Sequence, residues 1–325
     1  MNPKKLLPCL AILVLSALVA APVASAKTSV RVGIGDQSPR MFESEAYQDL
    51  NLKRTRYFVP ADVMQDREER GKARAFVKAA RKNKVSTLLH ISTDDLRRKR
   101  GDLVSKRAYH RNVNRIVRYF RKLGVRDFGA WNEVNHDSQE TWNRVSHAVS
   151  YFKSMYRAVR KRCKSCKVVG LDVLDQRGVE RYIAAFYRRL SSTWRKRLRV
   201  VGIHNYSDVN RNRTRGTRRI IREVRSHNKR ARFWFTETGA LASLRTNFSY
   251  SESRQAKRMR NVFRYAKRFR RAGVRRVYTY NWFGSESAAV DCGETCLFDA
   301  GLVNPDGTTR DAYTVFKRSA RSFKR

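Results

Sequence analysis

The sequence has 325 residues, with 72 Lys and Arg against 28 Asp and Glu, so its formal charge is +44 and its isoelectric point is near 11.1. A disordered basic chain is excluded, because 41% of the residues are hydrophobic and 11% are aromatic, which is enough to build a core. This length suits either two small domains or one large α/β barrel.

The N-terminal segment has the pattern of a secretory signal peptide. Two lysines precede an apolar run over residues 6–20, and small residues close the segment at Ala26. The apolar run is too short and too interrupted by proline to favour a membrane-spanning helix. We therefore expect residues 1–26 to be removed. The mature chain, 27–325, is expected to be secreted or associated with the cell wall, with no membrane span.

Four cysteines follow this segment, in two close pairs. They are Cys163 with Cys166, and Cys292 with Cys296. An even number in an exported chain favours a local disulfide in each pair. A redox motif at the first pair and a four-thiolate zinc site are the alternatives, and the unequal spacing of the distant pairs argues against zinc.

Short apolar runs of β type alternate with long amphipathic segments along the mature chain. The strands are predicted over 29–34, 54–59, 86–91, 126–131, 167–172, 200–204, 232–236 and 275–281. The helices are predicted over 67–82, 105–123, 139–162, 179–196, 216–226, 251–272 and 310–320, with a weaker pattern over 39–50. Eight strand–helix units without a linker predict a single α/β domain, a (β/α)8 TIM barrel. The alternative, an open doubly wound sheet, lacks the third glycine of its phosphate-binding turn after Gly33 and Gly35.

The helical segments explain how so basic a chain can fold. Over 251–272, apolar residues such as Met259, Val262 and Phe263 recur at helical spacing, while Lys and Arg fill the other faces. The excess charge therefore coats the outside of the barrel. Two interpretations stay open, attraction to polyanions such as acidic glycans, and a solvated surface. Because the charge is spread over all helices, nucleic acid is not expected as a specific partner.

Glutamates stand where two of the predicted strands end. The fourth strand ends in Trp131-Asn132-Glu133, and the seventh in Thr236-Glu237-Thr238-Gly239. Chemistry in such barrels resides at the carboxyl ends of the strands, so Glu133 and Glu237 are expected to face a common cleft. Two carboxylates in an aromatic cleft suit glycosidic bond cleavage. One protonates the leaving oxygen, while the other meets the positive charge that develops at the anomeric carbon.

The motifs at 131–133 and 236–239 resemble the signatures of the clan A superfamily of retaining glycoside hydrolases, which are built on (β/α)8 barrels. The resemblance implies that Glu133 is the acid/base, that Glu237 is the nucleophile, and that Asn132 bonds the sugar 2-hydroxyl. The implied activity is retaining hydrolysis of O-glycosidic bonds in a poly- or oligosaccharide. The basic surface makes an acidic or cell-wall-associated polymer attractive as substrate. This chemistry needs no metal and no organic cofactor.

Further positions extend the resemblance over nearly the whole mature chain. It implies that a tyrosine after strand six orients the nucleophile, that a tryptophan after strand eight lies under the sugar, and that an arginine on strand two supports the nucleophile. The residues at these and neighbouring strand ends are Arg56, His90, Asp172, His204, Tyr206 and Trp282. We expect them to line the substrate cleft.

A different class of function fits the same composition. A non-catalytic, strongly basic barrel could bind cell-wall glycans or other polyanions without cleaving them. The presence of both Glu133 and Glu237 argues against this alternative, because a pure binder has no need of the two.

Overall fold

The computed structural model describes residues 30–93, 103–244, 247–285 and 298–323. The predicted signal peptide, 1–26, and the pair formed by Cys292 and Cys296 lie outside these ranges. Within them, no helix combines the length and the apolar character needed to cross a membrane.

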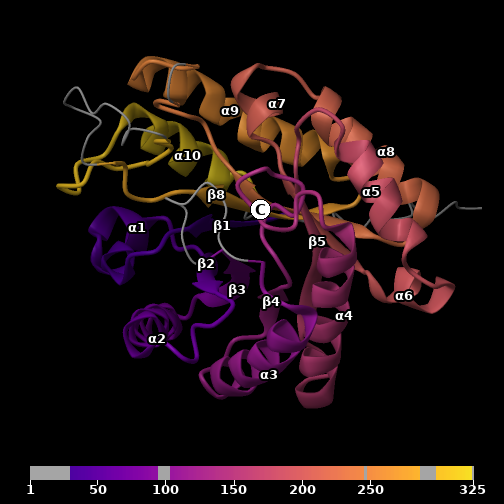
Figure 1. The fold of residues 1–325 in the computed structure, drawn as a ribbon. Coiled ribbons are helices and arrows are strands. Elements are labelled where there is room, and N and C mark those ends of the chain that lie inside the picture. Colours follow the sequence, from indigo (N-terminus) through magenta and orange to yellow (C-terminus); the bar gives the residue numbers. More distant parts are fainter. Residues whose placement is uncertain (1–29, 94–102, 245–246, 286–297, 324–325) are drawn as a thin grey trace, which may run out of the picture.

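Eight parallel strands form a closed barrel in which each strand pairs with its neighbour in chain order and β8 pairs with β1 (Figure 1). Each observed strand ends within two residues of its predicted bounds. This arrangement confirms the predicted (β/α)8 barrel. The strands are β1 (Arg31–Gly35), β2 (Arg54–Pro60), β3 (Ser86–Ser92), β4 (Asp127–Gly129), β5 (Lys167–Leu174), β6 (Val200–His204), β7 (Arg232–Thr238) and β8 (Val274–Tyr280).

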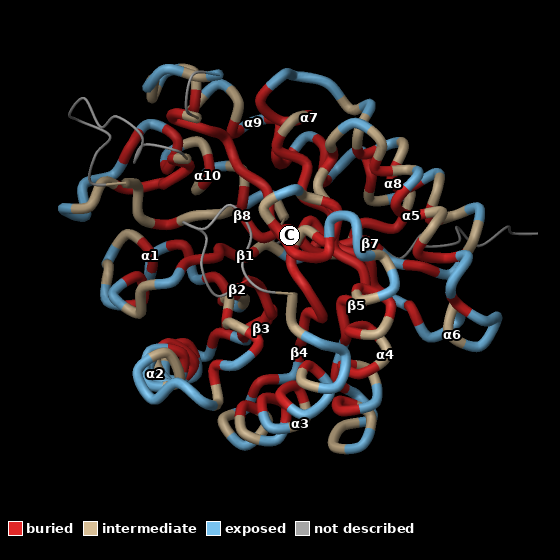
Figure 2. The backbone as a smooth tube through the Cα atoms, viewed as in Figure 1, coloured by how far each residue is buried: buried red, intermediate tan, exposed pale blue. Residues whose placement is uncertain are grey.

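The helices surround the barrel, and the longer ones bury one face while their outward faces are exposed (Figure 2). Side-chain caps fix the starts of several of them, as where Asp66 accepts a bond from the Glu69 N–H at 2.9 Å. The helical elements are η1 (Pro39–Glu43), α1 (Glu45–Asp49), α2 (Arg67–Lys82), α3 (Lys106–Lys122), α4 (Val145–Arg162), α5 (Val179–Arg188), α6 (Ser192–Arg197), α7 (Tyr206–Asn210), α8 (Arg215–His227), α9 (Glu252–Phe269) and α10 (Asp311–Arg321).

Three predicted helices differ from the structure. The weakly predicted one, over 39–50, is the 3-10 helix η1 followed by α1, with Ser44 between them. The helix expected from 139 begins only at Val145, because the preceding residues are tied to the end of β4: Gln139 accepts a bond from Trp131 Nε1 at 3.0 Å. The helix expected over 179–196 is two helices, α5 and α6. Their break is stabilised by Arg195, whose Nε donates to the carbonyls of Tyr187 and Leu190 at the end of α5.

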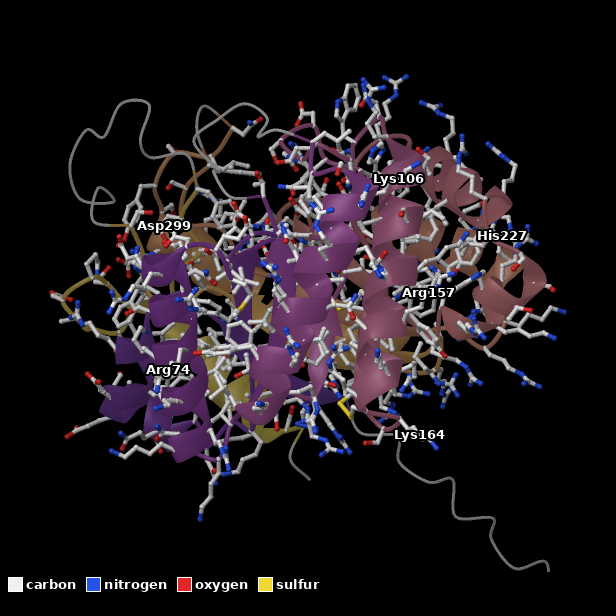
Figure 3. All side chains as sticks on the ribbon, turned by 60° about the horizontal axis from the view of Figure 1, so that its bottom comes forward. Arg74, Lys106, Arg157, Lys164, His227 and Asp299 are labelled. Carbon is white, nitrogen blue, oxygen red and sulfur yellow. A yellow bond between two sulfur atoms is a disulfide. The ribbon has the colours of Figure 1, made fainter. Side chains whose placement is uncertain are left out.

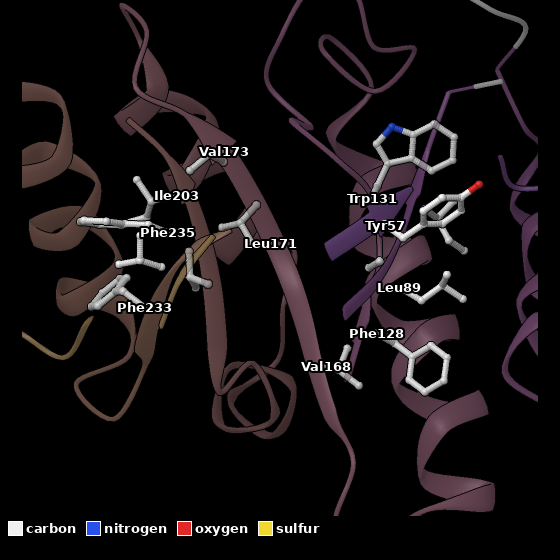
Figure 4. Packing of buried hydrophobic residues seen from close by; sticks show 14 of the residues in the cluster. Tyr57, Leu89, Phe128, Trp131, Val168, Leu171, Val173, Ile203, Phe233 and Phe235 are labelled. Carbon is white, nitrogen blue, oxygen red and sulfur yellow. The ribbon is translucent and has the colours of Figure 1, made fainter. Parts of the chain in front are cut away.

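Apolar side chains fill the space between strands and helices (Figure 4). This core includes Tyr57 on β2, Leu89 on β3, Phe128 on β4 and Phe235 on β7. A smaller cluster of buried residues comprises Leu88, Val169, Val200, Trp234 and Tyr278. These two clusters stabilise the barrel, and the barrel in turn holds the polar residues at the ends of its strands in place.

The two ends of the barrel are formed by different parts of the chain. We call the end where the strands finish the mouth, and the opposite end, where the helices finish and the strands begin, the base. Lys106 at the start of α3 and Asp299 lie toward the mouth, whereas Lys164, just after α4, lies toward the base (Figure 3). The disulfide between Cys163 and Cys166 is also at the base, which confirms one of the two predicted pairs.

Candidate active site

Glu133 and Glu237 come together at the mouth from β4 and β7. One carboxylate oxygen of each and one ring nitrogen of His204 lie within 4.8 Å of one another. The side chain of Glu133 is 15% exposed and that of Glu237 is 10% exposed, so both reach solvent from a largely buried setting. The structure thus brings the two predicted carboxylates to one place.

Two donors hold the Glu237 carboxylate. Arg56 on β2 donates from Nη1 to Oε2 at 2.6 Å, and the Tyr206 hydroxyl donates to Oε1 at 3.0 Å. Arg56 also donates from Nη2 to Asn132 Oδ1 at 2.8 Å, which links the nucleophile candidate to the end of β4. Burial, followed by the charge of Glu237, raises the pKa of Tyr206 well above its ordinary value, so the phenol keeps its proton and stays a donor.

Glu133 has an unusual backbone conformation. Its φ of +40° lies in the left-handed region, which residues with a Cβ seldom adopt. The residues on either side are held by neighbouring strands: Asn132 N–H donates to the Ile91 carbonyl at 2.8 Å, and Val134 N–H donates to the Asp172 carbonyl at 3.0 Å. The barrel therefore imposes the turn that follows β4 at Glu133.

His204 on β6 joins Glu133 to a buried aspartate. Its Nδ1 lies 2.8 Å from Glu133 Oε1, and its Nε2 lies 2.9 Å from Asp172 Oδ2. Burial alone would lower the pKa of His204, but the charges of Asp172 and Glu237 outweigh it and raise the pKa to about 10. His204 is therefore an imidazolium at neutral pH.

The imidazolium of His204 lowers the pKa of Glu133 and of Asp172, the two carboxylates that lie closest to it. Burial would raise the pKa of Glu133, but the hydrogen bond and the charge of His204 lower it below the ordinary value. Burial would likewise raise the pKa of Asp172, but the charge and hydrogen bond of His204, together with the charge of Arg56, hold it far below the usual range. Asp172 is thus a fixed negative charge beneath the mouth.

Two glycines make room for this buried charge network. A Cβ on Gly202 of β6 would lie 1.6 Å from Asp172 Oδ1, and a Cβ on Gly129 of β4 would lie 2.1 Å from the His90 ring. Thr236 completes the surroundings of Asp172 by donating its hydroxyl to Oδ1. A glycine inside a strand signals such a close approach, and it is the sequence feature that points to the network.

Several residues predicted to bind substrate are instead buried under the two glutamates. Arg56 is 1% exposed, and His90 and His204 are fully buried. His90 Nδ1 lies 3.1 Å from Arg56 Nη2, and burial lowers the pKa of His90 to about 3, so its ring is neutral and can accept from the guanidinium. Arg56 and His204 thus contact the two glutamates from below, and His90 contacts Arg56.

The prediction that Trp282 lies under the substrate sugar is wrong. Its ring is fully buried and packs edge-on against Tyr47 and Tyr313, with ring centroids 5.4 and 6.0 Å apart. Its backbone N–H donates to Asp36 Oδ2 at 3.0 Å, which fixes the chain after β8. The sequence pattern gives the position of this tryptophan correctly but not the side on which its ring packs.

Other rings gather near the glutamates. Tyr280 packs near Phe58 and Phe298, with centroids 5.8 and 6.2 Å apart, and Phe298 also meets Tyr206 at 5.2 Å. Neither Phe58 nor Phe298 is among the residues that the sequence motifs predict for the site. Phe298 comes from a segment far along the chain from the other mouth residues, and no local pattern marks it.

The cluster of Glu133, His204 and Glu237 has donor atoms of the kind that bind metal ions. Two features oppose a cation there. The guanidinium of Arg56 lies 2.6 Å from Glu237, and the high pKa of His204 keeps the nitrogen that would ligate a metal protonated. The arrangement suits two carboxylates that exchange protons with a substrate better than it suits a metal centre.

Comparison with known proteins finds no matching protein-family model and no matching curated protein. Solved structures do match. A glucosidase from Croceicoccus marinus has a TM-score of 0.65 at 12% identity, over 90% of this chain and 66% of that chain. An exo-β-1,4-mannosidase from Opitutaceae bacterium strain TAV5 has a TM-score of 0.64 at 13% identity, over 91% and 59%. A Penicillium canescens endo-1,4-β-xylanase has a TM-score of 0.61 at 11% identity, over 91% and 95%.

The chain thus spans just under two thirds of the glucosidase and still less of the mannosidase, but nearly all of the xylanase. At these sequence identities the likeness concerns the fold. The structural neighbours of this chain are glycoside hydrolases, and it shares their eight-stranded parallel barrel.

Proposed function

We propose that this chain is a retaining O-glycoside hydrolase that acts on a poly- or oligosaccharide. The observation that carries the proposal is the approach of Glu133 and Glu237, whose carboxylate oxygens come within 4.8 Å. Retaining enzymes need carboxyl groups roughly 5–5.5 Å apart, whereas inverting enzymes leave room for water at roughly 6.5–9.5 Å. The similarity in fold to a glucosidase, a mannosidase and a xylanase supports the same class of reaction.

In the first step Glu237 attacks the anomeric carbon while Glu133 gives its proton to the departing oxygen. The bond to the leaving group breaks as the bond from the sugar to Glu237 forms. Arg56 and Tyr206 hold one oxygen each of Glu237, so the attacking carboxylate is already oriented. His204 bonds Glu133 and stabilises the carboxylate that remains after proton donation.

In the second step Glu133, now a carboxylate, removes a proton from water, and the water attacks the sugar carbon bonded to Glu237. The sugar leaves with its original configuration after two inversions. Asn132 can bind a sugar hydroxyl throughout. Because its Oδ1 accepts from Arg56, its amide NH2 is the group left to donate to a substrate.

The test is the release of reducing sugar by the purified mature chain from a panel of neutral and acidic polysaccharides. Glu237→Gln keeps the shape of the side chain but removes the nucleophile, and Glu43→Gln, an exposed position, is the matched control. Release that is lost only in Glu237→Gln supports the proposal, and NMR of the first product should show the retained anomer.

Two outcomes would contradict the proposal. Full activity in Glu237→Gln would exclude the nucleophile, and an inverted anomer would exclude the retaining mechanism. If the chain binds a polysaccharide tightly yet cleaves none of the panel, the non-catalytic alternative replaces the enzyme.

We also propose that the chain is exported, on the sequence pattern of residues 1–26. The disulfide between Cys163 and Cys166 supports this, because disulfides persist in oxidising compartments. Mass spectrometry of the protein from culture medium, with Lys27 as its first residue, is the expected result. Full-length protein retained in cells would contradict it.

A further inference from the structure

The charge of this protein is distributed unequally between the two ends of the barrel. The base is built from the seven segments 49–54, 81–86, 121–127, 160–167, 188–200, 225–232 and 267–275, each of which joins the end of a helix to the next strand. These segments contain 28 Lys and Arg but only two acidic residues, Asp49 and Asp127. The base is therefore a strongly cationic face on the side of the molecule opposite the two glutamates.

Both acidic residues form ion pairs with cations outside these segments. Asp127 pairs with Arg276, and Asp49 pairs with Lys317 and Arg321, all of which lie outside the seven segments. Among the described residues, no ion pair joins any of the 28 cations to an acidic side chain. The base thus carries 28 cations against two acidic residues, and both of these are already paired elsewhere.

The helix dipole explains only part of this arrangement. Cations in the last turn of a helix interact favourably with its negative end, as do Arg121 and Lys122 in α3, but the effect fades beyond that turn. Other exposed cations lie past the helix ends, among them Lys164, Lys167 and Lys229. Like charges gathered in this way repel one another, and an external polyanion would relieve that repulsion.

A pocket of about 250 Å³ gives the base a concave place for an anionic group. Arg81 and Lys84 line it, together with Ser86 and Thr87 at the start of β3. One carboxylate of a polymer can be bound there by two cations and a hydroxyl, while its neighbours meet the surrounding lysines and arginines.

Among the described residues, the base carries no exposed aromatic ring on which nucleic-acid bases could stack. The exposed large aromatic side chains among the described residues are Trp142 and Tyr250, which follow β4 and β7 at the mouth. At the base, Trp194 is covered by Arg197, whose guanidinium lies 4.7 Å from the ring centroid. Single-stranded nucleic acids are bound by stacking on exposed rings, and duplexes by an element that enters a groove. The base thus offers no ring for stacking among its described residues, and its pocket, with two cations and a hydroxyl for one anionic group, favours a linear polymer that carries one carboxylate on each unit.

We propose that the base is a docking face for a linear acidic polysaccharide bearing carboxylates, separate from the site at the mouth. Docking there tethers the protein to an anionic matrix while the mouth points away from the bound chain. The proposal does not depend on catalysis, because the two surfaces lie at opposite ends of the barrel.

The test compares two variants of the mature chain that lose the same charge from different surfaces. The base variant changes six exposed lysines to glutamine: Lys82, Lys122, Lys164, Lys167, Lys196 and Lys229. The wall variant changes six exposed cations that lie on the helices, away from their C-terminal ends, to glutamine: Arg74, Arg111, Arg115, Arg218, Lys257 and Arg260. Binding to labelled polygalacturonate is measured in the Glu237→Gln background, so that hydrolysis cannot interfere.

The base variant is expected to bind on the order of 50-fold more weakly at low salt, from about twofold per exposed cation, and the wall variant only a few-fold more weakly. Added salt should remove most of the difference, because screening shortens the range of these charges. Equal loss in both variants would overturn the docking face. Tighter binding of a random-sequence DNA duplex than of polygalacturonate at the same salt would overturn the partner class.

A second measurement needs no variant. Acetylation of lysines in the wild-type chain, with and without polygalacturonate, is followed by mass spectrometry. Protection of Lys164 and Lys196 but not of Lys106 or Lys257 is expected. Protection of Lys106 and Lys257 to the same extent would show that the polymer covers the whole molecule, and would overturn the proposal.

Discussion

Two buried arginines lie inside the barrel, one toward each end, and their surroundings differ in kind. Toward the base, Arg276 donates to both oxygens of Asp127, at 2.6 and 3.4 Å, and to the Tyr278 hydroxyl at 3.1 Å. Its guanidinium also lies 3.6 Å from the centroid of the Trp234 ring. One cation and one anion satisfy each other here, so this pair is a closed structural unit.

At the mouth, Arg56 is shared. It bonds Glu237, Asn132 and His90, and it lies 3.6 Å from Asp172. Through Asp172 the network continues to His204 and Glu133, so several titratable groups compete for few protons. A closed pair can only stabilise the fold, whereas a shared network can also release and take up a proton. Substitutions around each arginine can separate these two roles.

The largest effect is expected at the mouth. Glu237→Gln should lower kcat by on the order of 10⁴-fold, because a lost nucleophile removes the covalent step. Its free energy of unfolding should change by less than about 1 kcal/mol, since the amide still accepts from Arg56, and Asp172, 3.6 Å from the guanidinium, remains as its counter-charge. Steady-state kinetics and urea unfolding measure both. A loss of stability in place of activity would assign Glu237 the role that Asp127 has at the base.

The next effect is expected on stability at the base. Asp127→Asn leaves the buried Arg276 without its counter-charge and should lower the free energy of unfolding by about 3 kcal/mol or more, with kcat unchanged. The double variant Asp127→Asn/Arg276→Met removes both charges and should recover part of the loss. If kcat falls with the single substitution while stability holds, the distinction between the two ends is wrong.

The third effect concerns the proton of Glu133. Glu133 must be protonated in the first step, and His204 lowers its pKa, so the alkaline limb of kcat/KM should lie at acidic pH. His204→Gln removes the positive charge, the pKa of Glu133 rises, and the limb should move to higher pH. Activity at the optimum should also fall by on the order of 10²-fold. His227→Gln at the end of α8 is the control, with no change expected in either quantity.

Protonated His204 also makes the stability of the fold fall as the pH rises. The pKa of His204 is raised to about 10 in the folded chain and is about 6.5 in the unfolded chain. Its stabilisation of the fold is therefore complete below about pH 6.5 and is lost as the pH rises toward 10. Thermal unfolding of the wild type between these values should show a falling Tm. A profile equally steep in His204→Gln would assign that fall to other groups.

The barrel and the two glutamates could be predicted from the sequence because both depend on local features of the chain. Buried strands and amphipathic helices follow local periodicity, and the ends of β4 and β7 are local features too, so Glu133 and Glu237 could be paired once the strand order was known. Tyr206 was found in the same way, at the end of β6.

The network beneath the mouth depends on register between strands, which no local pattern reveals. Asp172 reaches Thr236 because β5, β6 and β7 are adjacent and because Gly202 on the middle strand has no side chain to block the contact. The direction of the Trp282 ring likewise follows from Tyr47 and Tyr313, which come from opposite ends of the sequence. Such contacts become visible only when the barrel is closed.

The smallest effect is expected from the disulfide at the base. Cys163 and Cys166 are separated by three positions, so their bond closes a very short loop and should contribute about 2 kcal/mol or less by the chain-entropy estimate. Arg160 also holds this turn, because its Nη1 donates to the Cys166 carbonyl at 3.1 Å in addition to bonding the rest of the loop. Cys163→Ser/Cys166→Ser should therefore fold, lose a few degrees of Tm, and keep the kcat of the wild type. Reduced wild-type protein is the control and should match the double variant. A drop in kcat would mean that the turn after α4 affects the mouth, and the separation between the two ends of the barrel would fail at that point.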